Sequence, residues 1–262
     1  MKTINRNAGF TLVELLVVIG ILGILSAALY PAITSAVMSA QMTAVGARGK
    51  DIFVGITAAN TEREPLGLGN IWPKNGANVQ GGSGGDSDIA DMNFSSAVDF
   101  FKEVYDELHV SNQQDWNPYI IGFDYSKLAG AGVKTPTGNQ GLQAENCMWC
   151  IGANIRDEIE DVIPIIVTRN MNCNQLSVNY QGQTKTRVGL GTSAGGAEYD
   201  EPFSSKAFVI IQKGGGIYKG SGKYSTLNVI YKGQRFNLTT TGGNTPQFLY
   251  LTPNGTANPS GS

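Results

Sequence analysis

Charged side chains are scarce in this chain. They make up 15% of its 262 residues and leave a formal net charge of −2. The 19 lysines and arginines are scattered, with no basic run. Nucleic-acid-binding domains normally carry a basic patch or stripe. We therefore expect no nucleic-acid partner.

Histidine and cysteine are also scarce, at one and three residues. His109 stands alone, and a zinc site built on the C-x-x-C pair Cys147 and Cys150 would need a second pair of ligands. The sequence contains no nucleophile–base pair and no phosphate-binding loop beside these residues. These absences predict a protein without enzymatic activity and without a cofactor.

The N-terminal region is rich in apolar residues instead. The run from Phe10 to Tyr30 contains one ionised side chain, Glu14, and about 20 residues suffice to span a bilayer. Lys2 and Arg6 precede it, which predicts a cytoplasmic N-terminus. The apolar core of a secretory signal peptide is shorter, roughly 7–15 residues. An acid inside a membrane span indicates a function, although Glu14 could also lie shallow enough to reach the headgroups.

The segment Gly9–Ile19 resembles the type IV prepilin signature, shared by type IV pilins and the pseudopilins of type II secretion systems. Pro31 lies where that family commonly places a helix-disturbing proline. Three further stretches, 146–151, 164–170 and 207–215, resemble segments of large pseudopilin-like proteins. The resemblance implies a pilin-like α+β fold, with a long N-terminal helix packed on a globular domain that contains a short helix and an antiparallel sheet.

The resemblance also implies a sequence of processing steps. A prepilin peptidase would cut between Gly9 and Phe10 and methylate the new amine of Phe10. Glu14 would neutralise the Phe10 amine of a neighbouring subunit, because an unpaired buried charge is costly. The partners would be the peptidase, other pilin or pseudopilin subunits, the inner membrane, and the assembly platform with its ATPase.

The function predicted on this basis is a structural subunit of a type II secretion pseudopilus or a type IV pilus-like filament. The subunit would cross the bacterial inner membrane once, hold its C-terminal domain in the periplasm and then enter the filament. The alternative is a low-copy tip or ligand-binding module on such a filament. Trp72, Trp116 and Tyr119 are the candidate ligand contacts for that alternative, or else ordinary core residues.

The chain divides into a leader (1–9), an N-terminal helix (10–60), a globular domain (61–251) and a disordered tail (252–262). Small and apolar residues recur along the helix at steps of three and four, as on one face of an amphipathic helix. They are Ile33, Val37, Ala40, Ala44, Ile52, Ile56 and Ala59. Pro31 should kink the helix, and Gly46 and Gly49 allow either local melting or a close packing contact.

The globular domain should contain one helix and several strands. The helix is expected over 94–108, and strands over 148–154, 162–168, 203–213, 224–231 and 235–240. A turn at Gly214–Gly216 should join the third strand to its continuation. Pro164 predicts a sheet edge or a bulge in the second strand.

Two groups of residues leave alternatives open. Asp86, Asp88 and Asp91 could bind calcium or lie at a helix N-terminus, which favours carboxylates. In an oxidising compartment Cys147, Cys150 and Cys173 could form a disulfide. Cys147 and Cys150 point to opposite faces if they share a strand. Cys173 could therefore pair with either, and free thiols are a further option.

Overall fold

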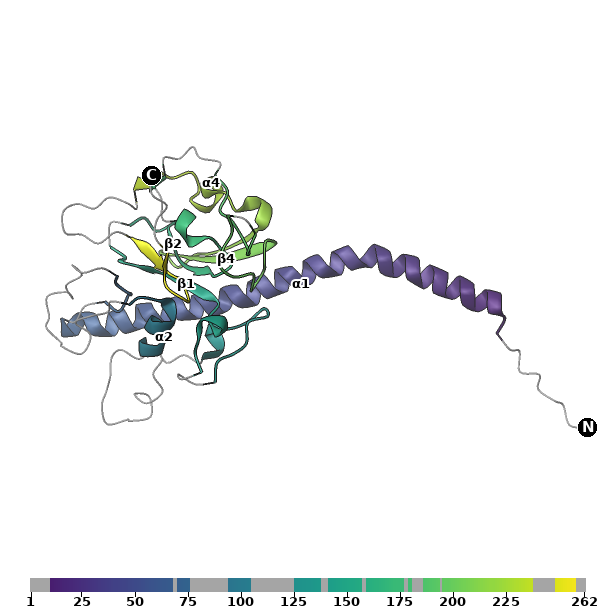
Figure 1. Cartoon of the computed structure of the whole chain (residues 1–262), viewed down its shortest axis with the longest axis horizontal. Helices are drawn as coiled ribbons and strands as arrows, with labels where there is room; N and C mark the ends of the chain where they lie inside the picture. The colour runs from purple at the N-terminus through teal and green to yellow at the C-terminus, as the bar shows by residue number, and fades with distance from the viewer. Residues whose placement is uncertain are drawn as a thin grey trace, which may run out of the picture. The chain divides into compact units, whose positions relative to one another are not determined.

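The computed structural model describes residues 10–67, 70–75, 94–104, 125–137, 141–156, 159–176, 179–180, 186–193, 195–237 and 248–257. The chain divides into two compact units, Met1–Gln41 and Met42–Ser262, and each is described by itself. The fold is α+β and pilin-like, with a long N-terminal helix, an antiparallel sheet and short helices (Figure 1).

Helix α1 (Leu12–Arg63) confirms the expected N-terminal helix and ends three residues beyond its predicted end. A 3₁₀ turn, η1 (Glu64–Leu66), follows it. The helix continues through Pro31, whose carbonyl accepts a hydrogen bond from Thr34 Oγ1 at 3.0 Å. The kink at Pro31 stays a prediction.

The main sheet is antiparallel, with strand order β5-β4-β2-β1-β7-β8. Its strands are β1 (Trp149–Ala153), β2 (Pro164–Thr168), β4 (Ala207–Gln212), β5 (Ile217–Ser221), β7 (Leu249–Leu251) and β8 (Thr256–Ala257). A separate pair joins β3 (Asn179–Tyr180) to β6 (Phe236–Asn237). The predicted strands over 148–154, 162–168 and 203–213 correspond to β1, β2 and β4.

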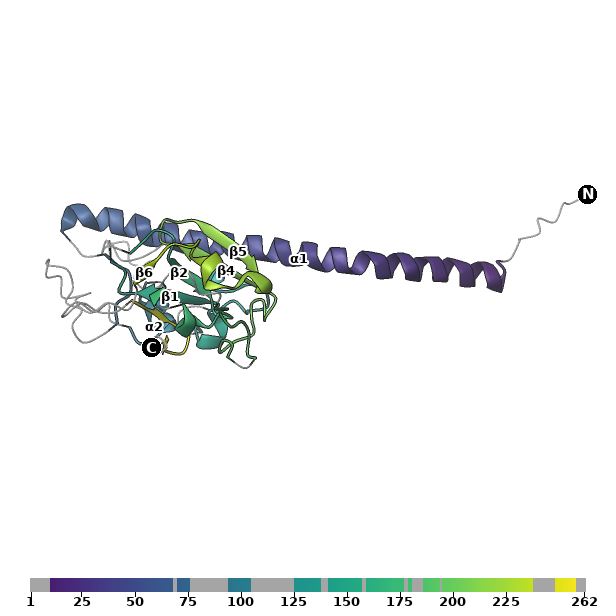
Figure 2. The same cartoon turned by 90° about the horizontal axis from the view of Figure 1, so that it is seen from above.

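The centre of the sheet is buried on both faces, because every residue of β1, β2 and β4 is buried. The second half of α1 covers one face, as Figure 2 shows from above. A Cβ at Gly49 would lie 2.8 Å from Trp149 Cη2 and 2.9 Å from Ile211 Cγ1. The glycine therefore provides a close packing contact, and the helix does not melt at Gly46 or Gly49.

The opposite face of the sheet carries a hydrophobic cluster. Short helices and loops supply its outer layer, including η4 (Cys173–Gln175) and α4 (Leu227–Ile230). Its buried members are Cys150, Ile159, Ile163, Val167, Met171, Cys173, Leu176, Val188, Leu190, Phe208, Ile210, Leu227, Ile230, Tyr231, Phe248 and Tyr250. Two layers of cover explain why the central strands read as nearly continuous apolar runs in the sequence.

The predicted strand over 224–231 is wrong. This segment instead forms η5 (Gly222–Tyr224) and α4, and the Thr226 carbonyl accepts hydrogen bonds from Val229 N and Ile230 N at 3.0 Å. Leu227, Ile230 and Tyr231 are buried, a spacing of three and four residues that fits a helix better than a strand. The helical spacing overrides the β-branched composition.

The expectation that Pro164 marks a bulge or a sheet edge is confirmed in one part. The bulge at Pro164 is confirmed, since the register shifts between Pro164 and Ile166. Strand β2 is nevertheless central, between β4 and β1, and not at an edge.

The predicted disordered tail does not begin at Thr252, because β8 pairs with β7 and continues the sheet to Ala257. The predicted turn at Gly214–Gly216 is confirmed, with Gly215 at φ +76°.

The two predicted helical patterns also need adjustment. Helix α2 (Ala97–Val104) begins three residues later than predicted, with Ser96 Oγ accepting from Asp99 N at 3.1 Å at its start. The predicted end at 105–108 lies outside the described residues. On α1 the buried stripe runs through Val45 in place of Ala44, which is exposed. Ile33 and Val37, placed in the same stripe by the sequence, are also exposed.

Candidate functional site

The first turn of α1 carries the residues that the sequence marks as functional. Thr11 N and Thr11 Oγ1 donate to Glu14 Oε2 at 2.8 and 2.7 Å, and Glu14 N donates back to Thr11 Oγ1 at 3.3 Å. This reciprocal pattern is a capping box, which satisfies amide groups that the first helical turn leaves without partners. Phe10 precedes it with its side chain 78% exposed, and Gly9 lies outside the described residues.

The surface that follows is apolar on all sides of the helix. Every residue from Leu12 to Val37 is exposed, including Leu12 at 83% and Ile24 at 73%. Among the described residues, α1 is the one helix long and apolar enough to cross a membrane, judged by length and composition, with a mean hydropathy of 2.6 in its apolar window. A helix that is apolar all round belongs in a protein core or a membrane.

Small residues interrupt this surface without any packing partner. A Cβ built at Gly20 or Gly23 would meet nothing within 4 Å. These positions contrast with Gly49, where the sheet leaves no room for a Cβ. The N-terminal half of α1 therefore exposes apolar side chains, and bare backbone at Gly20 and Gly23, to lipid or to neighbouring molecules.

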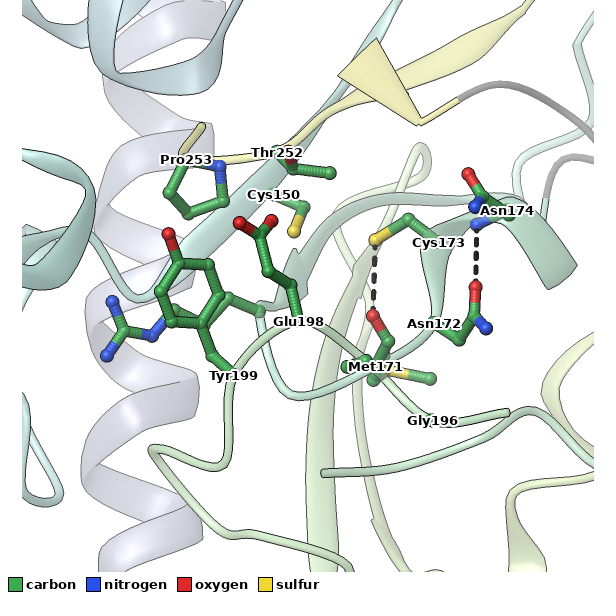
Figure 3. Close-up of a pocket in the computed structure, with 12 residues that line it drawn as sticks. Cys150, Met171, Asn172, Cys173, Asn174, Gly196, Glu198, Tyr199, Thr252 and Pro253 are labelled. Carbon is green, nitrogen blue, oxygen red and sulfur yellow. Dashed lines mark hydrogen bonds between the residues drawn. The ribbon is translucent and has the colours of Figure 1, made fainter. Parts of the chain in front are cut away.

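A cavity of about 190 Å³ lies in the globular unit (Figure 3). Its lining includes Arg169, which is 4% exposed. Arg169 Nη1 donates to the carbonyls of Ala144, Glu145 and Cys147 at 2.7, 3.0 and 3.1 Å, and Nη2 pairs with Glu201 Oε2 at 3.4 Å.

The Arg169 guanidinium also stacks on Tyr199, 4.2 Å from the ring centroid. Burial is the main cause that raises the pKa of Tyr199 to about 12. The guanidinium thus ties the 144–147 segment to the loop at Glu201. This arrangement supports a structural role for Arg169, and the cavity shows no constellation of a catalytic site among the described residues.

The three cysteines are buried thiols in this structure. Cys147 Sγ donates to the Trp149 carbonyl at 3.5 Å, and burial raises the pKa of Cys147 to about 12. Cys150 and Cys173 both line the cavity (Figure 3). The sequence did not distinguish the pairings, and a disulfide stays a prediction.

Of the remaining candidate ligand-binding and metal-binding residues, the structure describes Trp72. Trp72 is half-buried and packs against Phe53 at 6.2 Å between ring centroids, as a core-edge residue does. Trp116 and Tyr119 lie outside the described residues, as do His109 and the calcium candidates Asp86, Asp88 and Asp91. Within the described ranges, no group of three His, Cys, Asp or Glu side chains could hold a metal ion.

Comparison with known proteins identifies the N-terminal region alone. A family model described as the prokaryotic N-terminal methylation motif matches residues 4–30. No curated protein and no solved structure gives a significant match. The matched span is the prepilin-type signal of type IV pilins and pseudopilins, and it includes Phe10, Thr11 and Glu14. The motif supports a pilin-like filament subunit, a structural class of protein rather than a class of enzymes.

Proposed function

We propose that this chain is a processed structural subunit of a type II secretion pseudopilus or a type IV pilus-like filament. The observation that carries the proposal is the N-terminal half of α1. It combines a prepilin-type signal with a helix that is exposed and apolar on every side. Such a surface is stable in a bilayer or when packed on the helices of identical subunits.

Processing would create a positively charged amine on Phe10, close to the Glu14 carboxylate. In our proposal a prepilin peptidase cleaves between Gly9 and Phe10 and methylates the new Phe10 amine. This amine lies one residue before Thr11, whose N and Oγ1 already donate to the Glu14 carboxylate. Cleavage would therefore place a positive charge close to a carboxylate that the capping box holds at the helix N-terminus.

During assembly the Glu14 carboxylate would gain a new partner, the Phe10 amine of a neighbouring subunit. Between helices packed in a filament, an unpaired charge is costly, and an opposite charge a few ångströms away relieves the cost. We propose that Glu14 of one subunit accepts the Phe10 amine of its neighbour. The platform and ATPase of the inner membrane would supply the work of extracting the apolar helix.

The orientation follows from the charges that flank the helix. Lys2 and Arg6 precede the apolar run, and cations favour the cytoplasmic side. The unit Met42–Ser262 would then lie on the periplasmic side before assembly. It would form the outer part of the filament subunit afterwards.

The first test determines the mature N-terminus and then compares filament assembly of two variants, at Glu14 and at Glu62. Mass spectrometry of protein from native membranes should find a chain that begins at methylated Phe10. Glu14→Leu should be processed normally and yet be lost from the sheared filament fraction. Glu62→Leu removes an exposed acid near the other end of α1 and should assemble as the unmodified chain does.

Two results contradict the proposal. One is a chain that begins at Met1 or after the apolar run. The other is a Glu14→Leu protein that enters filaments at the level of the unmodified chain. The copy number per filament separates a shaft subunit, present in many copies, from the low-copy tip or ligand-binding module.

A further inference from the structure

We propose that Cys150 and Cys173 form a disulfide bond in the exported protein and that Cys147 remains a thiol. Cys150 and Cys173 both belong to the hydrophobic cluster behind the sheet, and both line the cavity of Figure 3. Cys147 belongs to neither. The pairing depends on the export that the proposed function requires, but its chemistry can be tested on the isolated chain.

The chain path brings the two side chains together. Cys150 lies on β1 opposite Val167 of β2. After β2 the chain turns, with Met171 N bonded to the Thr168 carbonyl at 3.0 Å, and begins η4 at Cys173. This turn returns Cys173 to the face of the sheet on which Cys150 lies.

The two thiols share one cavity wall. Cys173 Sγ donates to the Met171 carbonyl at 3.6 Å, the contact dashed in Figure 3. Cys150 and Cys173 both line the cavity, and their side chains lie next to each other in Figure 3. The fold therefore brings these two of the three thiols to the same place before any oxidation.

The backbone excludes the pair Cys147–Cys150. Cys147 is extended, at φ −101° and ψ 114°, and β1 begins two residues later. Three extended residues span about 10 Å between Cα atoms. Disulfides need Cα atoms within roughly 7 Å. The C-x-x-C spacing of the sequence therefore does not correspond to a redox pair in this fold.

The reaction is a two-step exchange with a protein or small-molecule disulfide that reaches the cavity. The Cys173 thiolate attacks one sulfur of that disulfide and releases the first thiolate. The Cys150 thiolate then attacks Cys173 Sγ in the mixed disulfide and releases the second. Two electrons pass from the cysteines to the incoming disulfide, and the two protons pass to solvent or to the released thiolates.

The order of the steps follows from the environments of the two groups. Cys173 is 4% exposed and Cys150 is 1% exposed, so an oxidant reaches either thiol only through the cavity that both line. The neighbouring Cys173 thiol, and then burial, raise the pKa of Cys150 well above its ordinary value. Cys150 is therefore the slower nucleophile and suits the second step.

The test uses the full-length mature chain in mild detergent, incubated with reduced or oxidised glutathione. A non-reducing peptide map should show one cross-link, Cys150 to Cys173, with Cys147 alkylated. The bond closes a loop of more than 20 residues, so the midpoint of thermal unfolding should rise by about 6–12 °C. Cys147→Ser is the matched control and should keep both the cross-link and the shift.

Cys150→Ser and Cys173→Ser should each lose both the cross-link and the shift. A cross-link that contains Cys147, or alkylation of all three residues after oxidation, overturns the proposal. The peptide map of the unmodified chain decides this even if a variant fails to fold. Protein taken from cells with its thiols blocked at lysis should contain the same bond, and three blocked thiols there would also overturn the proposal. The same spectra give the N-terminus, so a failure of processing is read separately.

Discussion

The two halves of α1 are both apolar, yet they are used in different ways. In the first half, Leu12 and Ile24 are 83% and 73% exposed, and the apolar residues run consecutively around the helix. In the second half, Ile52 and Ile56 are fully buried, while Val54 between them is 51% exposed. An apolar stripe thus marks packing within the chain, and apolarity all round marks a surface for lipid or other subunits.

The largest expected difference comes from shortening one isoleucine in each half. Ile52→Ala leaves a cavity where a fully buried side chain of α1 was and should lower the free energy of unfolding of the globular unit by about 2–5 kcal/mol. Ile24→Ala should leave that free energy unchanged, because Ile24 is exposed. Urea unfolding of the full chain in detergent, followed by the fluorescence of buried Trp149, measures both. Equal effects of the two substitutions would abolish the distinction between the halves.

The glycines give a second, smaller contrast. Gly49→Ala places a methyl group against Trp149, whose Nε1 is held by the Lys127 carbonyl at 2.9 Å, and against Ile211. Overpacking costs about 1–3 kcal/mol and outweighs the gain of about 1 kcal/mol in helix propensity. Gly49→Ala should therefore lower the free energy of unfolding by up to about 2 kcal/mol.

Gly23→Ala is the matched control on the other half. Its Cβ would meet nothing within 4 Å, so the globular unit should unfold at the same urea concentration as the unmodified chain. A Gly49→Ala protein that is more stable than the unmodified chain would show that the sheet adjusts to α1 at no cost. The contact at Gly49 would then not be a fixed feature of the fold.

The prepilin-type signal at the start of α1 is the sequence prediction that the family comparison confirms. The prepilin-type signal is a contiguous stretch of residues and can be recognised without knowledge of the fold. The resemblance of Gly9–Ile19 to that signal agrees with the family match at residues 4–30. In the second half the predicted stripe is confirmed at Ile52, Ile56 and Ala59, which are buried, but at its start Val45 is buried in place of Ala44. Steps of three and four residues fit two adjacent positions equally well, and the choice depends on the partner surface.

Errors in the globular unit came from segments whose partners lie far away in the sequence. The segment 227–231 has strand-forming residues, yet Leu227, Ile230 and Tyr231 pack behind the sheet as a helix. Strand β8 lies in a stretch of Pro, Asn and Gly, and its pairing with β7 has no local signature. The meeting of Cys150 with Cys173 also depends on the turn after β2, which no residue spacing reveals.

The smallest expected effect concerns the polar ties between the second half of α1 and the rest of its unit. Asp51 Oδ2 lies 2.6 Å from Lys127 Nζ, and the side chains are 45% and 33% exposed. Exposed pairs of this kind contribute about 0.2–1 kcal/mol. A double-mutant cycle with Asp51→Asn and Lys127→Met should find a coupling free energy in that range, and salt should reduce it.

Lys50 on the same half of α1 donates to the Gly215 carbonyl at 2.7 Å and provides a comparison for the salt dependence. This acceptor is neutral, so the cost of Lys50→Met should vary less with salt than the Asp51–Lys127 coupling does. A coupling well above 1 kcal/mol would mean that ion pairing, beside the apolar stripe and its glycine contact, holds this half of α1 to the rest of its unit. The contrast between the two halves would then be one of charge as well as of apolar pattern.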